Sequence, residues 1–385
     1  MISQRDRYKA IARFERPGDL WYRDTFWNET TKRWLAEGAP GVLVSGPRRG
    51  EYFGFGHSRG MGEIASGLGN AEYIAGDVEA YLPLPPIIPR FEPRVVSEDA
   101  TTVVLVNQGG QTVRVLKNAP QRMPMYLDHP VKDRDTWKEY KKRLDPTTPE
   151  RWPSDWAAYV DKMNSRDFPV ILSVGSFFGF LREWMGVENL LFAFYDDPAL
   201  VEDMMDTMLH LEREVIKRTL KDIRVDQANF WEDMCYKAGP LISPAMFKKF
   251  MVPRYQQLTE LLRDSGVDII YVDSDGNVGE LLPLWLEAGI NYIWPLEVAA
   301  GNDVVAIRKK YGKDLILGGG IDKRALLKGE AAIREEVFSK VPFLLEQGGY
   351  FPCIDHLVPP DVTFENYCCY VNTLREAGGL EKLSL

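Results

Sequence analysis

Acidic side chains and one histidine follow several short apolar runs in the second half of this chain. The three main groups read Glu232-Asp233, Asp273-Ser274-Asp275 and Cys353-Ile354-Asp355-His356. Carboxylates that meet in a site shielded from water cannot all stay ionised, so they either bind a cation or keep some of their protons. Their residue types therefore fit metal binding or proton transfer. The alternative is that these acids cap helices and pair with lysines.

The possible metal ligands are few. Asp273 and Asp275 stand two residues apart, so both would point to the same side of an extended backbone. Carboxylates with a histidine and a thiol suit Zn²⁺, whereas carboxylates alone suit a harder ion. We expect the ligands to come from Asp273, Asp275, Cys353 and His356. Which of the first three faces inward depends on the strand register. The Cys353–His356 spacing alone is a weak motif, because it arises often by chance.

His356 is the strongest single candidate. It is one of only four histidines, and Pro359 and Pro360 predict a rigid loop around it, which favours a role in a site over burial in the core. Gly318-Gly319-Gly320 also follows an apolar run. Such glycines bind phosphate in some barrels, but they equally permit close packing of a loop, and we favour packing.

Aromatic side chains crowd the same positions along the chain. They predict a pocket with flat, apolar walls, suited to a ring or a small methylated compound. The expected substrate contacts are Trp21, Phe178, Trp231 and Trp294, with Asp233 orienting the substrate.

The spacing of apolar runs predicts the elements that would hold these side chains. Six strands alternate with helices after about residue 150, at 168–173, 225–231, 267–272, 290–294, 315–317 and 350–354. Such alternation indicates parallel strands joined by helical crossovers. Two further strands at 20–23 and 73–82 would complete a (β/α)₈ barrel, in which reactive groups sit where strands end. A doubly wound open sheet is the alternative.

The first 150 residues read as an elaboration of one domain that spans residues 1–385. Two β-branched runs flank Asn107-Gln108-Gly109-Gly110 and predict a β-hairpin over about 101–117.

Composition narrows the function classes. The 385 residues carry 47 basic and 56 acidic side chains, a formal net charge of −9, which argues against a nucleic-acid partner. No stretch approaches the roughly 18 to 20 apolar residues that a membrane helix needs. Four cysteines, two of them adjacent, and a charged start without an apolar segment favour reduced thiols in the cytoplasm.

Residues from about 170 to 372 resemble the uroporphyrinogen decarboxylase superfamily, which includes corrinoid-linked methyltransferases. The resemblance implies a (β/α)₈ barrel and a homodimer. The matching segments are Val174-Gly175-Ser176-Phe177-Phe178-Gly179, Met185-Gly186-Val187-Glu188-Asn189-Leu190, Ile242-Ser243-Pro244, Asp275-Gly276-Asn277, Gly319-Gly320-Ile321-Asp322-Lys323 and Gly348-Gly349-Tyr350, together with the opening Arg5 to Asp19.

The resemblance is weaker for true porphyrinogen decarboxylases. Those proteins carry an arginine-rich segment after the first strand that holds the substrate carboxylates. Here the segment reads Trp21-Tyr22-Arg23-Asp24-Thr25-Phe26, and only Arg23 matches. The methyltransferase members bind zinc through a His-x-Cys pair and a later cysteine. Those positions fall on Asp273, Asp275 and the neighbourhood of His356, so carboxylates and a histidine replace the softer ligands.

We therefore expect an enzyme that moves a methyl group from a small substrate to a corrinoid on a partner protein. His356 and Asp275 would hold a metal such as zinc or donate the proton, and Glu232 would assist them. The first alternative is a cofactor-free decarboxylase of an acidic ring, in which Asp275 stabilises the cationic intermediate and Arg23 holds the departing carboxylate. The second is a non-catalytic binder of a corrinoid or tetrapyrrole.

Overall fold

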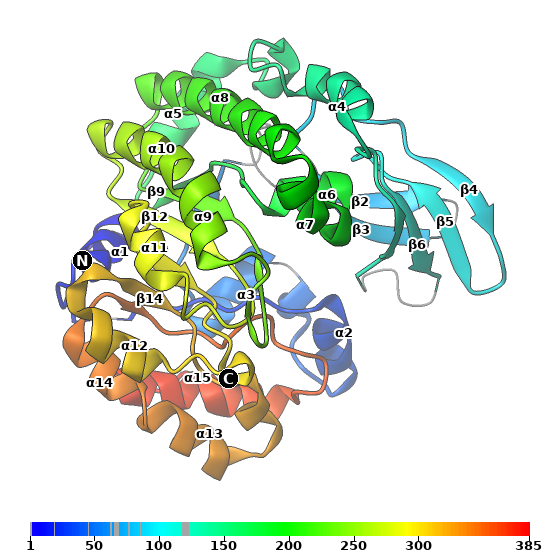
Figure 1. The fold of residues 1–385 in the computed structure, drawn as a ribbon. Coiled ribbons are helices and arrows are strands. Elements are labelled where there is room, and N and C mark those ends of the chain that lie inside the picture. Colours follow the sequence, from blue (N-terminus) through cyan, green and yellow to red (C-terminus); the bar gives the residue numbers. More distant parts are fainter. Residues whose placement is uncertain are drawn as a thin grey trace.

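A curved sheet of parallel strands forms the centre of the computed structural model, which describes residues 2–18, 20–44, 46–61, 64, 69–75, 78–84, 86–117 and 123–385. Its seven strands run in the order β1-β8-β9-β12-β13-β14-β15, and every neighbouring pair is parallel (Figure 1). The strands are β1 (Arg59–Gly60), β8 (Val170–Ser173), β9 (Gln227–Trp231), β12 (Ile269–Asp273), β13 (Tyr292–Trp294), β14 (Ile316–Gly318) and β15 (Tyr350–Phe351). The last six correspond to the six strands predicted after residue 150. The fold is thus an α/β fold with a curled parallel sheet, of the TIM-barrel type.

Helices follow one another around the outer face of this sheet (Figure 1). Several begin at a capping residue followed by proline, as at Asp197-Pro198 and Ser243-Pro244, where the side chain accepts a hydrogen bond from a backbone amide of the first turn. The helices are α6 (Gly179–Met185), α7 (Val187–Asp196), α8 (Pro198–Asp222), α9 (Pro244–Phe250), α10 (Val252–Asp264), α11 (Leu282–Glu287), α12 (Val304–Tyr311), α13 (Glu330–Phe338), α14 (Val341–Gln347) and α15 (Phe364–Ala377). A short hairpin of β10 (Cys235–Tyr236) and β11 (Gly239–Pro240) follows β9.

The predicted strand at 20–23 is wrong. This segment is extended, but it makes only scattered hydrogen bonds: the Tyr22 carbonyl accepts from the Gly56 amide, and the Asp24 carboxylate accepts from the Ile354 amide. Phe26 adds a single bridge to Val358. The segment therefore runs beside the loop after β15 without joining the sheet by a ladder.

The predicted strand at 73–82 is also wrong as a barrel strand. Its residues fall in β2 (Gly69–Ala75) and β3 (Val78–Leu84), which pair with each other antiparallel and outside the parallel sheet; residues 76–77 lie outside the described part. Among the described residues the parallel sheet therefore has seven strands and not the predicted eight.

A four-stranded antiparallel sheet projects from the first half of the chain (Figure 1). Its strands are β4 (Arg94–Glu98), β5 (Thr102–Val106), β6 (Thr112–Leu116) and β7 (Met125–Asp128). The two runs predicted around Asn107 to Gly110 are β5 and β6, and Asn107 shapes their turn by accepting hydrogen bonds from the Gly109 and Gln111 amides. The sequence did not predict β4 and β7, which flank this pair.

The remaining helices belong to the first half of the chain as well. They are α1 (Gln4–Ala12), α2 (Asn28–Ala36), α3 (Gly46–Phe53), α4 (Arg134–Lys141) and α5 (Trp156–Asn164). Helix α1 lies under the parallel sheet, where Tyr8 stacks on Phe351 of β15.

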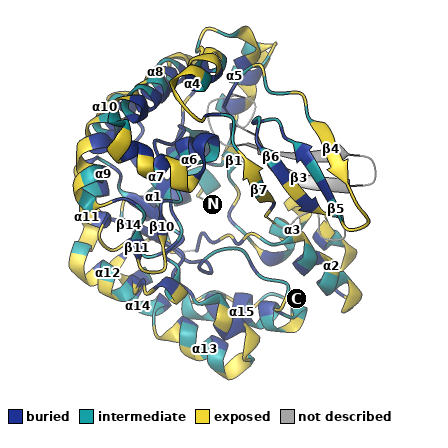
Figure 2. Ribbon diagram, turned by 45° about the vertical axis from the view of Figure 1, so that its right-hand side comes forward, coloured by how far each residue is buried: buried dark blue, intermediate teal, exposed yellow. Residues whose placement is uncertain are grey.

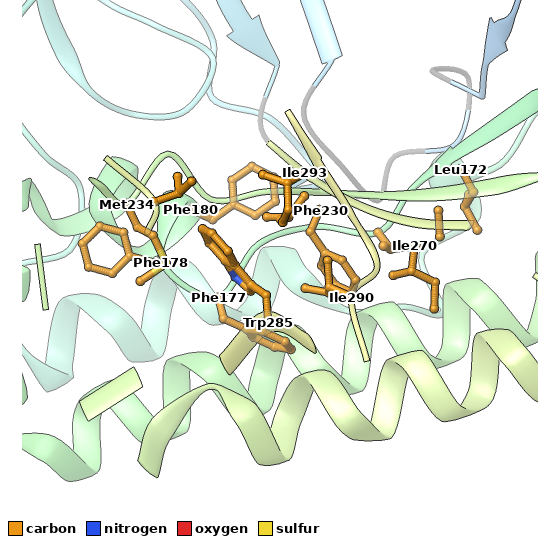
Figure 3. Packing of buried hydrophobic residues seen from close by; sticks show 14 of the residues in the cluster. Leu172, Phe177, Phe178, Phe180, Phe230, Met234, Ile270, Trp285, Ile290 and Ile293 are labelled. Carbon is orange, nitrogen blue, oxygen red and sulfur yellow. The ribbon is translucent and has the colours of Figure 1, made fainter. Parts of the chain in front are cut away.

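The main core lies between the parallel sheet and its helices. Buried residues concentrate on the strands and on the helix faces turned towards them (Figure 2). Phe177, Phe178, Phe230 and Trp285 all belong to this cluster (Figure 3). In the described part of the chain, no helix is both long enough and apolar enough to span a membrane.

Candidate active site

His356 and Asp275 meet where two strands end. The Nε2 atom of His356 lies 3.5 Å from Oδ2 of Asp275, and the two residues come from the loops after β15 and β12. The Trp294 ring at the end of β13 stacks on the imidazole with 5.8 Å between ring centroids. His356 has a φ of 150°, which L side chains rarely adopt. All three residues were predicted from the sequence as site residues, and the structure brings them together.

Partial burial and neighbouring acidic groups keep the Asp275 carboxyl partly protonated near neutral pH. Burial, Asp233 and Glu297 raise the pKa of Asp275 to about 7, against the opposing effect of Lys323 and Arg182. Its Oδ1 atom is buried and finds no hydrogen-bond partner among the residues that the structure describes. A buried oxygen without a partner favours the neutral, protonated carboxyl.

The histidine is shifted in the opposite sense. Burial and the nearby Lys323 ammonium lower the pKa of His356, although Glu297 and Asp233 oppose this shift. Near pH 7 the pair therefore combines a neutral imidazole with a carboxyl that is close to half protonated. Burial and Asp275 also raise the pKa of Asp273 well above its ordinary value, so Asp273 contributes little negative charge.

Two cations balance the acidic groups around the pair. Arg182 binds the Asp233 carboxylate at 2.9 Å and lies over the Trp231 ring. On the other side, Lys323 Nζ lies 3.5 Å from Oε1 of Glu297, whose other oxygen accepts a hydrogen bond from the Gly276 amide. Neither Arg182 nor Lys323 was predicted as a site residue, because neither belongs to an acidic group at a strand end.

Glu232 is fully buried, and its carboxylate is occupied by the start of α6. It accepts hydrogen bonds from five donors: the amides of Phe177, Phe178 and Gly179 and the hydroxyls of Ser176 and Tyr255. Through these hydrogen bonds, Glu232 positions the loop after β8. Phe178, expected to contact substrate, lies fully buried in the core cluster (Figure 3).

A cavity of about 300 Å³ opens beside His356. Of the expected substrate contacts, Trp21 and Trp294 line this cavity, whereas Phe178, Trp231 and Asp233 do not. Its other walls near the strand ends are Arg23, Asp24, Thr25, Pro352, Cys353 and Ile354. Its deeper walls are Tyr8, Ile171, Gln227, Asn229, Tyr271, Tyr292 and Phe351.

Arg23 brings a positive charge to this cavity. Its guanidinium donates to the Ser58 hydroxyl at 3.0 Å, and within the described chain no carboxylate pairs with it. Ser58 belongs to Gly56-His57-Ser58-Arg59-Gly60, a G-x-S-x-G spacing that the sequence analysis overlooked. A nucleophile elbow needs the serine between a strand and a helix, but here the serine precedes strand β1. The spacing therefore indicates no nucleophile.

The predicted metal ligands do not assemble into a metal centre. In the part of the chain that the structure describes, no group of three or more His, Cys, Asp or Glu side chains is arranged to hold an ion. Burial raises the pKa of the Cys353 thiol, which accepts a hydrogen bond from the Trp294 indole at 3.3 Å, and a metal would need the thiolate. Asp275 and His356 are a pair without a third donor, so this arrangement does not fit zinc.

The glycine triplet serves packing, as expected. A Cβ on Gly319 would stand 1.9 Å from the Pro295 carbonyl oxygen, and the Gly320 amide donates to that same oxygen. The Gly319 amide points at the Phe351 carbonyl. Both amides are therefore already bonded and are not available to a phosphate.

The comparisons with known proteins agree with this fold. A model of the family "Uroporphyrinogen decarboxylase (URO-D)" matches residues 103–377. A uroporphyrinogen decarboxylase of Legionella pneumophila (strain Paris) is 27% identical over 138 residues, which span 36% of this chain and 38% of the relative. The chloroplastic uroporphyrinogen decarboxylase of Zea mays is 26% identical over 103 residues, 26% of this chain and 25% of the relative. This chain thus aligns with well under half the length of each.

Among solved structures, a methyltransferase from Methanosarcina mazei has a similar fold. The match has a TM-score of 0.57 and covers 98% of this chain and 99% of that chain, at 14% sequence identity. That identity supports a shared fold and nothing finer. The family match, by contrast, extends over well more than half of the chain, and the protein belongs to the uroporphyrinogen decarboxylase family.

Proposed function

We propose that this protein is a methyltransferase that takes a methyl group from a small, flat substrate, with the Asp275–His356 pair supplying the proton that the leaving group needs. One observation carries the proposal: a carboxyl with a pKa raised to about 7 contacts an imidazole on the wall of a small aromatic cavity. His356 lines the cavity itself, and Asp275 supports it from behind.

The proton neutralises the leaving group of the methyl transfer. When the bond between a methyl carbon and an ether oxygen breaks, the oxygen keeps the electron pair and leaves as an anion unless it is protonated. The imidazole donates a proton to that oxygen and takes one from the Asp275 carboxyl. A proton donor works best when its pKa lies near the working pH, and Asp275 meets this condition.

The methyl acceptor that the family resemblance implies is a corrinoid on a partner protein, which supplies the nucleophile for the methyl carbon. We assign no residue of this chain to it. The proton transfer likewise involves no zinc, because the donor set in the described chain does not fit that ion.

Size and charge support a small substrate over a tetrapyrrole. Ligand pockets commonly measure about 300 to 1,000 Å³, and this cavity of about 300 Å³ lies at the lower end. Among the residues that line the cavity, Arg23 is the cation, so a ring with several carboxylates would find a single ion-pair partner there. The aromatic walls Trp21, Trp294 and Phe351 suit one flat ring.

Decarboxylation is the second candidate, and Arg23 is the observation that favours it. Its guanidinium lines the same cavity as His356 and has no carboxylate partner in the described chain. It would hold a substrate carboxylate while the Asp275–His356 pair protonates the ring carbon from which carbon dioxide leaves.

One experiment separates the two reactions. The protein is incubated with methoxybenzenes or methoxybenzoates, with and without reduced cobalamin as acceptor, and both methylcobalamin and carbon dioxide are measured. Methylcobalamin formation that is lost in Asp275→Asn and His356→Asn supports the proposal. The exposed Asp314→Asn and His210→Asn are matched controls that keep activity. Carbon dioxide release without acceptor would favour decarboxylation, and equal methyl transfer by the variants and the wild type would refute the proposal.

A further inference from the structure

The deeper half of the cavity contains a polar layer that the proton transfer does not use. We infer that Asn229, Tyr271 and Tyr292 recognise a neutral oxygen acceptor, such as a carbonyl or hydroxyl, on the end of the substrate opposite its methyl group. The orientation of the substrate in this inference rests on the proposed function. The recognition of the neutral oxygen rests on the cavity alone.

Strand register places the three side chains in one layer. Asn229 of β9 is paired with Tyr271 of β12, and Tyr271 is paired with Tyr292 of β13. All three line the cavity. The next layer towards the strand ends contains Asp273, paired with Trp294. Two residues of a parallel strand rise roughly 6.6 Å, so a single ring can span from the polar layer to the strand ends.

A chain of hydrogen bonds from α1 orients the Asn229 amide. The Tyr8 hydroxyl donates to Oε1 of Gln227, and Nε2 of Gln227 donates to Oδ1 of Asn229. Because this network fixes the amide, the Nδ2 group of Asn229 is left as a donor, and within the described chain it donates to no other residue. Helix α1 is itself held by the buried Asp226 carboxylate, which binds Arg5 at 2.8 Å.

The two tyrosines add hydroxyl donors. Neither hydroxyl has a hydrogen-bond partner among the described residues, although both side chains line the cavity. Burial raises the pKa of each phenol well above its ordinary value, so both keep their protons. Gly318 leaves room for the Tyr292 hydroxyl, because a Cβ there would stand 2.8 Å from that oxygen.

The charges of the cavity decide which acceptor fits this layer. Its charged walls, Arg23 and Asp24, belong to the segment beside the strand ends, and none of the residues in the polar layer is a cation. Three neutral donors suit a neutral acceptor, whereas a carboxylate would lose much of its hydration without gaining an ion pair. The substrate class is therefore a small ring with a transferable methyl group at one end and a neutral oxygen at the other.

Calorimetric binding of two probes tests the inference. The probes are anisole, which has no second oxygen, and para-methoxybenzamide, which adds a neutral carbonyl. We expect the wild type to bind the amide about tenfold more tightly than anisole. Asn229→Leu, Tyr271→Phe and Tyr292→Phe should each reduce this preference by about threefold to tenfold while the affinity for anisole is kept. The exposed Tyr236→Phe is the matched control that leaves the preference unchanged.

A fourth variant tests the hydrogen-bond chain. Tyr8→Phe removes only the hydroxyl that holds Gln227, so it should weaken the preference for the amide without touching the polar layer itself. Circular dichroism of every variant ensures that only folded proteins are compared. Equal affinity of the wild type for both probes, no binding of either probe, or an unchanged preference in all three variants of the polar layer would overturn the inference.

The outcome is separable from the proposed function. His356→Asn should lose methyl transfer and keep the probe preference, because His356 lies outside the polar layer. A preference that depends on Asn229 in a protein that transfers no methyl group would leave this inference standing and refute the proposed function. Methyl transfer by a protein that shows no preference between the probes would support the proposed function and refute this inference.

Discussion

The Nε2 atom of His356 stands 3.5 Å from Oδ2 of Asp275, although the two residues follow different strands of the sheet. The contact joins a carboxyl whose pKa is raised to about 7 with an imidazole whose pKa is lowered. These shifts leave the imidazole neutral and the carboxyl close to half protonated near neutral pH. In the proposed mechanism, the pair delivers a proton into the cavity that His356 lines.

The Asp275→Asn substitution removes the titrating carboxyl proton and keeps the size of the side chain. General acid catalysis contributes roughly a hundredfold to ten-thousandfold to a rate, so we expect kcat to fall by about that factor while the protein stays folded. Steady-state kinetics with an active methyl donor measure the effect. A variant with kcat within a factor of about two of the wild type would show that the carboxyl donates no proton in the rate-limiting step.

The pH dependence of the reaction has a predicted sign. The donor must be protonated, so turnover should be constant below the pKa of Asp275 and fall as the pH rises through about 7. Lys323 lowers the pKa of both Asp275 and His356. Lys323→Met should therefore move the falling limb to higher pH. A limb that stays in place, or moves to lower pH, would contradict this electrostatic account.

Glu232→Leu should destabilise the protein more than it impairs chemistry. The substitution leaves the amides of Phe177, Phe178 and Gly179 without their acceptor inside the core. Each buried donor without a partner costs about 1–3 kcal/mol, so the free energy of unfolding should fall by at least about 2 kcal/mol. Urea denaturation measures this change. A normal unfolding midpoint with lost turnover would instead make Glu232 a catalytic group.

Arg23→Met tests whether the substrate carries a carboxylate. If the guanidinium binds such a group, KM should rise about tenfold or more for a methoxybenzoate and stay unchanged for the matching methoxybenzamide. The comparison of the two compounds controls for lost packing by the arginine. Equal effects on both compounds would mean that Arg23 supports the wall of the cavity and does not bind a substrate carboxylate.

Zinc binding, expected from the resemblance, is tested by elemental analysis. Because Asp275 and His356 have no third donor in the described chain, we expect turnover to survive treatment with a chelator. Inductively coupled plasma mass spectrometry of the wild type and His356→Ala gives the metal content. About one zinc ion per chain, lost in the variant together with activity, would contradict this arrangement of donors.

The sequence predicted the strands after residue 150 correctly, and with them the site residues at their ends, but the strand that it predicted at 20–23 was wrong. Helices alternate with apolar runs after residue 150, and this periodicity located β8, β9, β12, β13, β14 and β15 and with them Asp275, Trp294 and His356. The run at 20–23 is apolar because Leu20 and Tyr22 are buried, so burial alone imitated a strand at a segment that forms no ladder with the described sheet. No local pattern distinguishes these two causes.

The sequence could not predict which groups contact the site side chains, and the reason is a different one. Glu232 has the type and the place of a catalytic acid, and only the backbone amides around it show that its oxygens are occupied. Lys323 and Arg182 act on Asp275 across strands, which no spacing reveals. Asn229 and Tyr271 lie within strands, and their shared layer depends on register.

A carbon-13 NMR titration of the aspartate carboxyl groups tests the central claim without a substrate. The resonance that disappears in Asp275→Asn should titrate near pH 7, and His356→Asn should change its midpoint, because the imidazole stands 3.5 Å from the carboxyl. A resonance of Asp275 that titrates near its ordinary value, about 3.9, would contradict the account, since a carboxylate fully ionised at neutral pH has no proton to give.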